Sequence, residues 1–221
     1  FILLHHIGNI LNPAQTEYNL LHVLCLLLDT NIEDIRSSQL LSQNIKTILV
    51  DRETQSLHRT QNTLLKLGSI RTVTRVLGRL YSSVEVEYTW KYAPLLLRLG
   101  ADTMSWENKE AQDDLVTSIL SAVDQNKPPE CNCMLGLQEL IRKCQVGIMS
   151  SVTGDGDREE EQQLNILRAS IQIFSFAGAL CRGDNTKSQR FLSADGTNNR
   201  NLVNISEALC LLLHAILVRL T

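Results

Sequence analysis

The sequence contains few aromatic residues and few prolines, and its positive and negative charges nearly balance. Phe, Trp and Tyr make up 5% of its 221 residues, there are four prolines, and the formal net charge is −3. Sheet sandwiches depend on aromatic and β-branched side chains, so the scarcity of aromatics argues against that fold class. A protein that grips nucleic acid over most of its surface would be basic, whereas this chain has a pI of about 6.0.

The chain also lacks the residue patterns of an enzyme. Residues 68–79 read GSIRTVTRVLGR, without the Lys-Ser/Thr ending of a phosphate-binding loop. No Ser/His/Asp or Cys/His set has a spacing that would bring a nucleophile to a base. Cys131, Cys133 and Cys144 offer three thiols where a structural zinc site needs four ligands. We therefore expect a protein that is not an enzyme and that holds no metal, cofactor or small-molecule substrate.

Long apolar runs and a cysteine framework are missing as well. No uninterrupted apolar run reaches the roughly 20 residues that a membrane-spanning helix needs, so we expect no membrane partner. The six cysteines do not form the pattern of a secreted, disulfide-rich chain. We expect an intracellular protein, nuclear or cytoplasmic. Because the chain begins at Phe1 rather than Met, we also expect a fragment of a larger protein.

What the chain does contain is leucine at helical spacing. Hydrophobic residues make up 43% of it, and they recur every three to four residues, while the alternation typical of strands is scarce. One helix is expected from about Thr16 to Asp29, and residues 63–81 are expected to form two helices broken near Gly68. We predict an all-α chain of about ten helices in one domain, residues 1–221, with possible loop breaks near 51–57, 124–130 and 151–161.

The first and last long apolar segments are apolar on almost every side. They run from Leu20 to Leu28 and from Ala208 to Val218. This pattern is typical of helices that are buried on more than one side. We expect both to be covered, by further repeats or by a partner subunit, because large exposed apolar patches are rare on monomers.

The stretch LCRGDNTKSQRFL, from Leu180 to Leu192, has three competing interpretations. It could be an adhesion tripeptide, a kinase target at its Ser-Gln pair, or a turn between two helices. The absence of secretory features favours the turn. Gly183 would end one helix, because glycine tolerates positive φ, and Asp184 or Asn185 would cap the next helix.

Two segments share one order of elements, which is an apolar helix, a polar turn, a short helix and a second apolar helix. They are Leu26 to Leu49 and Ala177 to Leu213, and Leu95 to Leu120 is a poorer third copy. This order resembles the armadillo repeat, and more loosely the HEAT repeat, in which about 40 residues form helices that stack on the next repeat. The resemblance implies an armadillo/HEAT-like α-solenoid that presents a long surface to other proteins.

Armadillo proteins that bind extended peptides carry a Trp and, four residues later, an Asn on the groove helix of each repeat. The corresponding positions in this chain are Ser175 and Ala179 in one segment, and His22 and Leu26 in the other. The repeated Trp and Asn are therefore missing from both segments. The resemblance therefore implies a partner that is helical or folded, and not an extended peptide.

One basic feature stands out. Arg71, Arg75 and Arg79 recur every four residues, so a helix would place all three guanidinium groups on one face. Such a stripe is either a solvated face or a docking site for an acidic partner segment or a phosphate backbone. We predict a protein–protein interaction scaffold, part of a larger complex, that binds its partner here. The alternative is a nucleic-acid-associated module in a chromosome-maintenance assembly for DNA repair or recombination.

Overall fold

The described part of the chain folds into helices. The computed structural model describes residues 15–80, 86–106, 108–124, 133–150, 157–193 and 205–220, which contain ten α-helices and no strand. The predicted all-α chain of about ten helices is confirmed, and no solenoid repeat is identified. The helices are α2 (Gln15–Leu26), α3 (Ile32–Ser37), α4 (Gln43–Lys66), α5 (Ser69–Arg79), α6 (Val86–Met104), α7 (Lys109–Asp124), α8 (Cys133–Ser150), α9 (Asp157–Cys181), α10 (Thr186–Ser193) and α11 (Ile205–Leu220).

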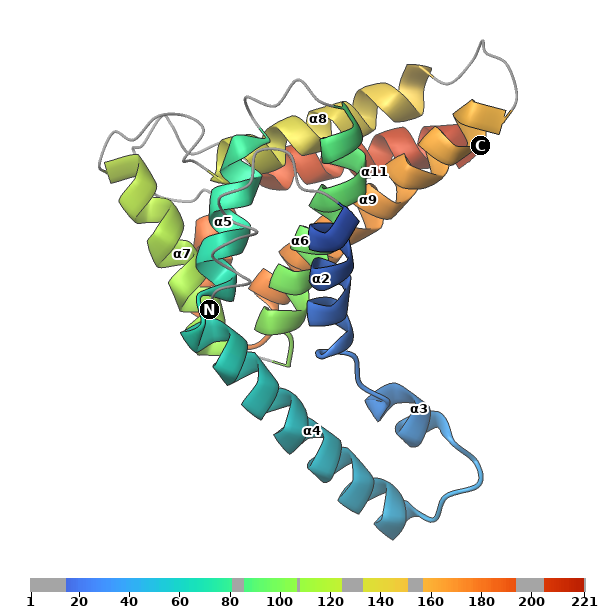
Figure 1. Ribbon diagram of the computed structural model, residues 1–221, viewed down its shortest axis with the longest axis vertical. Helices are drawn as coiled ribbons and strands as arrows, with labels where there is room; N and C mark the ends of the chain where they lie inside the picture. Colours follow the sequence, from blue (N-terminus) through green and yellow to red (C-terminus); the bar gives the residue numbers. More distant parts are fainter. Residues whose placement is uncertain are drawn as a thin grey trace.

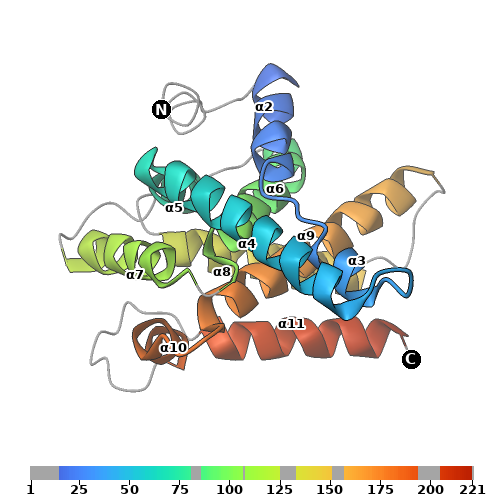
Figure 2. The ribbon, with the colours of Figure 1, turned by 90° about the horizontal axis from the view of Figure 1, so that it is seen from below.

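The long helices α6 and α9 form the centre of the molecule and share its most extensive contact (Figure 1). Helix α2 packs on α6 (Figure 2), while α8 packs on both α5 and α9, and α11 lies along α8 (Figure 1). Glycine lets the backbones approach where α8 crosses α5. A Cβ atom on Gly136 would lie only 1.7 Å from the carbonyl oxygen of Leu77. One core therefore connects the helices on either side of the centre.

The expected break near Gly68 is confirmed. Helix α4 ends at Lys66, Gly68 has a φ of 87°, and α5 begins at the next residue. Positive φ is costly for residues with a Cβ atom, which explains why glycine stands there. The apolar face of α5 then enters the core, where Val73, Val76 and Leu77 are fully buried.

Two expected boundaries near the N-terminal end were wrong. The loop expected near residues 51–57 does not exist, because α4 runs without interruption through them. The helix expected to reach Asp29 ends at Leu26, and the separate helix α3 follows it. The loops expected near 124–130 and 151–161 fall mostly outside the described residues, between α7 and α8 and between α8 and α9.

Helices α3 and α4 extend away from the rest of the molecule as an arm (Figure 1). Residues 43–56, the first half of α4, have no buried side chain, whereas Leu57 and Leu64 in the second half are buried. Apolar side chains on this first half are partly open to solvent, and Ile48 is 67% exposed. Only the second half of α4 is therefore anchored in the core.

The sequence suggested that the two most apolar helices, α2 and α11, are buried on more than one side. In the described part of the molecule each is buried on one side. Helix α2 buries Leu21 and Cys25 and exposes Val23. Helix α11 buries Leu212 and Ala215, and its outer face exposes four large apolar side chains. These four are Leu211, Leu213, Leu217 and Val218. Within the described part of the chain, both helices cover the core with one face and leave the other open.

The turn after α9 is the helix-to-helix turn that the sequence predicted. Helix α9 ends at Cys181, and Gly183 has a φ of 80°. The side-chain oxygen of Asn185 accepts hydrogen bonds from the backbone N–H groups of Lys187, at 3.2 Å, and Ser188, at 3.3 Å. Asn185 therefore caps α10.

Two buried glutamines complete the C-terminal ends of the central helices. Gln61, from α4, donates through its amide nitrogen to the carbonyl oxygens of Asp102, at 2.8 Å, and Ser105, at 3.1 Å. Gln112, from α7, donates in the same way to the carbonyl oxygens of Ala179, at 2.8 Å, and Arg182, at 3.1 Å. The last carbonyls of a helix have no partner within the helix, so these amides supply one from another helix.

One stretch of α9 is long and apolar enough to cross a membrane by length and composition. It is Glu161–Cys181, with a mean hydropathy of 1.4, and 39% of it is buried inside the molecule. The stretch includes polar and charged residues, so it is not an uninterrupted apolar run, and the absence of a membrane partner stays a prediction. The core helices of soluble proteins pass the same test, and α9 packs against α6, α8 and α10.

Candidate protein-docking groove

The three predicted arginines lie on α5, but not in equivalent surroundings. Arg71 and Arg75 are exposed, whereas Arg79, in the last turn of the helix, is partly buried. The opposite face of α5 is in the core, which fixes the direction in which the arginines project. The structure therefore separates Arg79 from the two arginines that face solvent.

Arg71 and Arg75 line a groove between α5 and α7, which we call the α5–α7 groove. Its volume is about 620 Å³. Figure 1 shows the two helices beside each other, with the end of α4 below them. One wall is basic and the other is acidic. The basic wall holds Lys66, Arg71 and Arg75, and the acidic wall holds Glu110, Asp113 and Asp114 of α7. Arg79 does not line the groove.

The turn before α10 and the first turn of that helix hold the acidic wall in place. Asn185 donates to a carboxylate oxygen of Asp113 at 3.1 Å, and Lys187 donates to the hydroxyl of Thr117 at 3.3 Å. Lys109, at the start of α7, forms an ion pair with Asp184. The turn identified in the sequence therefore has a structural role, because it fixes the helix that carries the carboxylates.

The sequence revealed the basic wall and missed the acidic one. The four-residue spacing of the arginines is a local signal, and Asp113 and Asp114 follow Glu110 on α7 by three and four residues. Nothing local shows that the two groups face each other, because α5 and α7 are separated in the chain by the whole of α6. That pairing follows from tertiary packing.

The groove suits a ligand that carries charges of both signs. A phosphate backbone would be attracted by Arg71 and Arg75 but repelled by the carboxylates opposite them. A polypeptide segment can place an acidic side chain against one wall and a basic side chain against the other. Exposed ion pairs of this kind contribute about 0–1 kcal/mol each, so they would select the partner and its orientation more than they would set the affinity.

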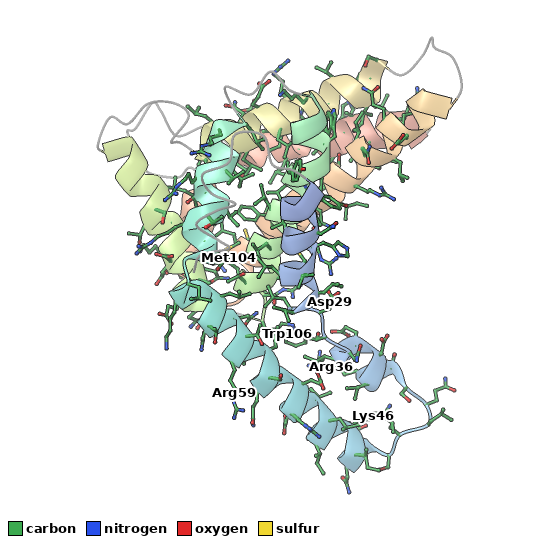
Figure 3. All side chains as sticks on the ribbon, viewed as in Figure 1. Asp29, Arg36, Lys46, Arg59, Met104 and Trp106 are labelled. Atoms are coloured by element: carbon green, nitrogen blue, oxygen red, sulfur yellow. The ribbon has the colours of Figure 1, made fainter. Side chains whose placement is uncertain are left out.

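The most strongly perturbed carboxylate lies elsewhere, where α2 meets the end of α6. Arg98 forms an ion pair with Asp29 and also donates to Asp102 at 3.3 Å. Figure 3 labels Asp29 where the chain leaves α2. Burial raises the pKa of Asp102 to about 6, although Arg98 acts in the opposite direction. We interpret this cluster as a structural link between the two helices.

The described cysteines show no sign of a metal site. Cys133 and Cys144 are buried, and burial raises the pKa of each thiol to about 12. Cys131 lies outside the described residues. Among the residues that the structure describes, no three His, Cys, Asp or Glu side chains come together in a group that could hold a metal ion.

Comparisons with known proteins identify no family for this chain. A scan against family models, a search of curated proteins and a search of solved structures found no match.

Proposed function

We propose that this protein is a non-enzymatic scaffold that binds a segment of another protein in the α5–α7 groove, as one subunit of a larger intracellular complex. The observation that carries the proposal is the pair of opposed charged walls in one open groove. The partner segment is expected to be helical or folded and to carry acidic residues that meet Arg71 and Arg75. A basic residue on the same segment would meet the carboxylates of α7.

The order of the helices supports a scaffold of the armadillo/HEAT kind. A long helix, a short helix and a second long helix follow one another in α2–α3–α4 and again in α9–α10–α11. The poorer third copy lacks the short helix, because α7 begins soon after α6 ends. Scaffolds of this kind bind partners on rigid helix faces. The open apolar faces of α2 and α11 agree with a subunit that has neighbours.

The alternative, a nucleic-acid-associated module, draws on the exposure of Arg71 and Arg75. The acidic wall argues against it, because phosphates in the groove would lie beside three carboxylates. The two proposals differ in a simple property. Binding through phosphate contacts weakens steeply with salt, since it depends on counterion release, whereas a protein partner held partly by apolar contacts resists modest salt.

The first test is affinity purification from native lysate with the double variant Arg71→Glu/Arg75→Glu. We expect the wild-type chain to retain a stoichiometric protein partner and the variant to lose it. Arg59→Glu is the matched control, because Arg59 is an exposed arginine of α4 outside the groove (Figure 3). A partner kept by both variants would move the interface away from the groove. Recovery of nucleic acid alone, released by modest salt, would favour the alternative.

A further inference from the structure

Helix α9 carries a second apolar stripe on the side that faces away from the core. Leu164 and Leu167 are each 46% exposed, and Ile171 is 63% exposed. Phe174 continues the stripe and is partly buried. At the next position, Gly178, a Cβ atom would have no neighbour within 4 Å, so the stripe stays open there. We call the four apolar side chains the α9 seam, namely Leu164, Leu167, Ile171 and Phe174.

The spacing of the α9 seam is that of a coiled coil. Its members are three, four and three residues apart, and Gly178 follows after four more. Apolar residues at alternating three- and four-residue intervals form a narrow stripe that fits one partner helix. The core of the molecule uses other residues of α9, including Ile166, Ile173 and Phe176, which are buried. The three exposed members of the seam, Leu164, Leu167 and Ile171, are therefore additional to what the fold requires, whereas Phe174 also packs against the core.

Charges at the two ends of the seam indicate the direction of the partner helix. Glu161 lies at the N-terminal end and Arg182 lies just after the C-terminal end, and both are exposed. A second α9 placed antiparallel would bring the acidic end of one copy toward the basic end of the other. A parallel arrangement would bring like charges together. The antiparallel order is therefore self-complementary.

We propose that two copies of this chain associate through their α9 seams, antiparallel about a two-fold axis. A closed two-fold contact uses the same patch on both subunits, which the α9 seam permits. Aligning the two heptad patterns sets Leu167 of one copy against Ile171 of the other, and Leu164 against Phe174. Near the two-fold axis, Arg168 of one copy lies beside Arg168 of the other. Both guanidinium groups are exposed, so solvent and salt screen their repulsion.

A pocket beside the seam supports this alignment. It lies where α8, α9 and α11 meet, has a volume of about 100 Å³, and is lined largely by apolar side chains. Leu167 is one of them, together with Ile148, Ile166 and Ile216. The pocket is larger than the space that one water molecule requires. In the proposed pair, Ile171 of the second copy lies opposite Leu167 and can place its side chain at this pocket.

The test measures the association of the purified chain as a function of concentration, by sedimentation velocity. We expect a dimer of the 24.8-kDa chain that dissociates on dilution, and a dissociation constant at least tenfold weaker for Ile171→Glu. Leu213→Glu is the control, because Leu213 is a similarly exposed apolar residue on α11, outside the seam. Thermal unfolding followed by circular dichroism checks that both variants remain folded, as expected at exposed positions.

A charge exchange tests the antiparallel order. In this register Glu161 lies level with Ala177 of the other copy, about one and a half helical turns from Arg182, so the two charges act at long range. Glu161→Arg and Arg182→Glu should each weaken the dimer at low salt, and the double variant should recover the wild-type dissociation constant. A chain that stays monomeric at all concentrations, or a dimer insensitive to Ile171→Glu, would overturn the proposal. So would a monomer that binds phosphatidylcholine vesicles through the seam, because the occupant would then be a membrane surface. The test needs no other protein, so its outcome is independent of the proposed scaffold function.

Discussion

Among the glycines of the described segments, Gly136 has the least room for a side chain. A Cβ atom there would overlap the carbonyl oxygen of Leu77, which is backbone and cannot rotate away. We expect Gly136→Ala to push α8 away from α5 and to lower the free energy of unfolding by about 3 kcal/mol, since overpacking costs about 1–3 kcal/mol or more. Urea unfolding monitored by circular dichroism measures the change.

Gly178 provides the matched control in another helix. The same substitution there meets open space, and alanine favours the helix over glycine by about 0.5–1 kcal/mol. We therefore expect Gly178→Ala to raise the midpoint of urea unfolding slightly. Equal losses at both positions would show that the close approach of α5 and α8 is not what limits Gly136.

Gln61 is expected to be the most important polar residue of the core. It is fully buried, and its amide satisfies the last carbonyls of α6 while its oxygen lies 3.1 Å from a ring nitrogen of His58. We expect Gln61→Leu to lower the free energy of unfolding by about 1–2 kcal/mol, because the carbonyl of Ser105 loses its amide donor, while that of Asp102 keeps the hydroxyl of Ser105 as a donor. The same substitution at Gln55, an exposed glutamine of the same helix, should change stability by less than about 0.5 kcal/mol.

Asp102 is the residue through which pH is expected to act on stability. Burial raises its pKa to about 6, whereas the carboxyl of an unfolded aspartate has a pKa near 3.9. Because the folded state holds the proton more tightly, its contribution to stability is complete below about pH 4 and is lost as the pH rises through 6. With the side chain 29% exposed, this contribution is of the order of 2 kcal/mol.

The substitution Asp102→Asn tests this dependence, because asparagine keeps the shape and cannot ionise. We expect the free energy of unfolding of the wild type to fall between pH 4 and pH 6 more steeply than that of the variant. Asp51→Asn, at an exposed position of α4, should leave the wild-type slope unchanged. Parallel slopes for wild type and Asp102→Asn would assign the pH dependence to other groups.

At the scale of single elements, the α3–α4 arm is expected to open most easily. The guanidinium of Arg36 lies 5.0 Å from the centroid of the Trp106 ring, and Lys46 donates to the carbonyl oxygen of Arg36 at 3.2 Å. Figure 3 shows these contacts at the base and along the inner side of the arm. A cation–π contact that is partly exposed contributes about 0.5–1 kcal/mol.

Hydrogen exchange measured by mass spectrometry tests the arm. We expect the amides of residues 44–56 to exchange at least tenfold faster than those of residues 57–66, because the first half of α4 has no buried side chain. Arg36→Ala should accelerate exchange in α3 and leave α6 unchanged. Uniform protection along α4 would mean that something covers the arm in solution.

Most of the elements were predictable because their signals are local. Leucine spacing identified the helices, and glycines with positive φ ended α4 and α9 at the expected places. The continuous α4 was missed because residues 51–57, DRETQSL, are mostly polar and belong to a helix that projects from the core. Because the projecting half of α4 buries no side chain, its sequence shows little of the apolar periodicity by which a helix is recognised.

At the scale of the whole molecule, the cysteines offer a measure of global unfolding. Cys25, Cys133 and Cys144 are buried, while Cys181 and Cys210 are exposed. We expect a maleimide to label Cys181 and Cys210 rapidly in the native protein. The three buried thiols should react slowly and at one common rate, because burial raises the pKa of each to about 12 and only global unfolding exposes all three. Different rates among the three, followed by peptide mapping, would divide the core into separate units.

The candidate site was predictable only in part, and the reason lies in tertiary structure. Arg71 and Arg75 were found from their spacing, but the carboxylates of α7 come from a helix that α6 separates from α5. The partial burial of Arg79 likewise depends on neighbours that are distant in the chain. The two arginines that face solvent could be distinguished from Arg79 only once the helices were placed together.

The two glutamines at the ends of α6 and α9 have a consequence for the order of events during protein synthesis. Gln61 precedes the carbonyl of Asp102 by 41 residues, and Gln112 precedes that of Ala179 by 67. In both cases the donor leaves the ribosome before the helix end that it completes. The glutamine that donates to the last carbonyls of each central helix is therefore synthesised before that helix. These hydrogen bonds can form during synthesis before any later segment of the chain has been made.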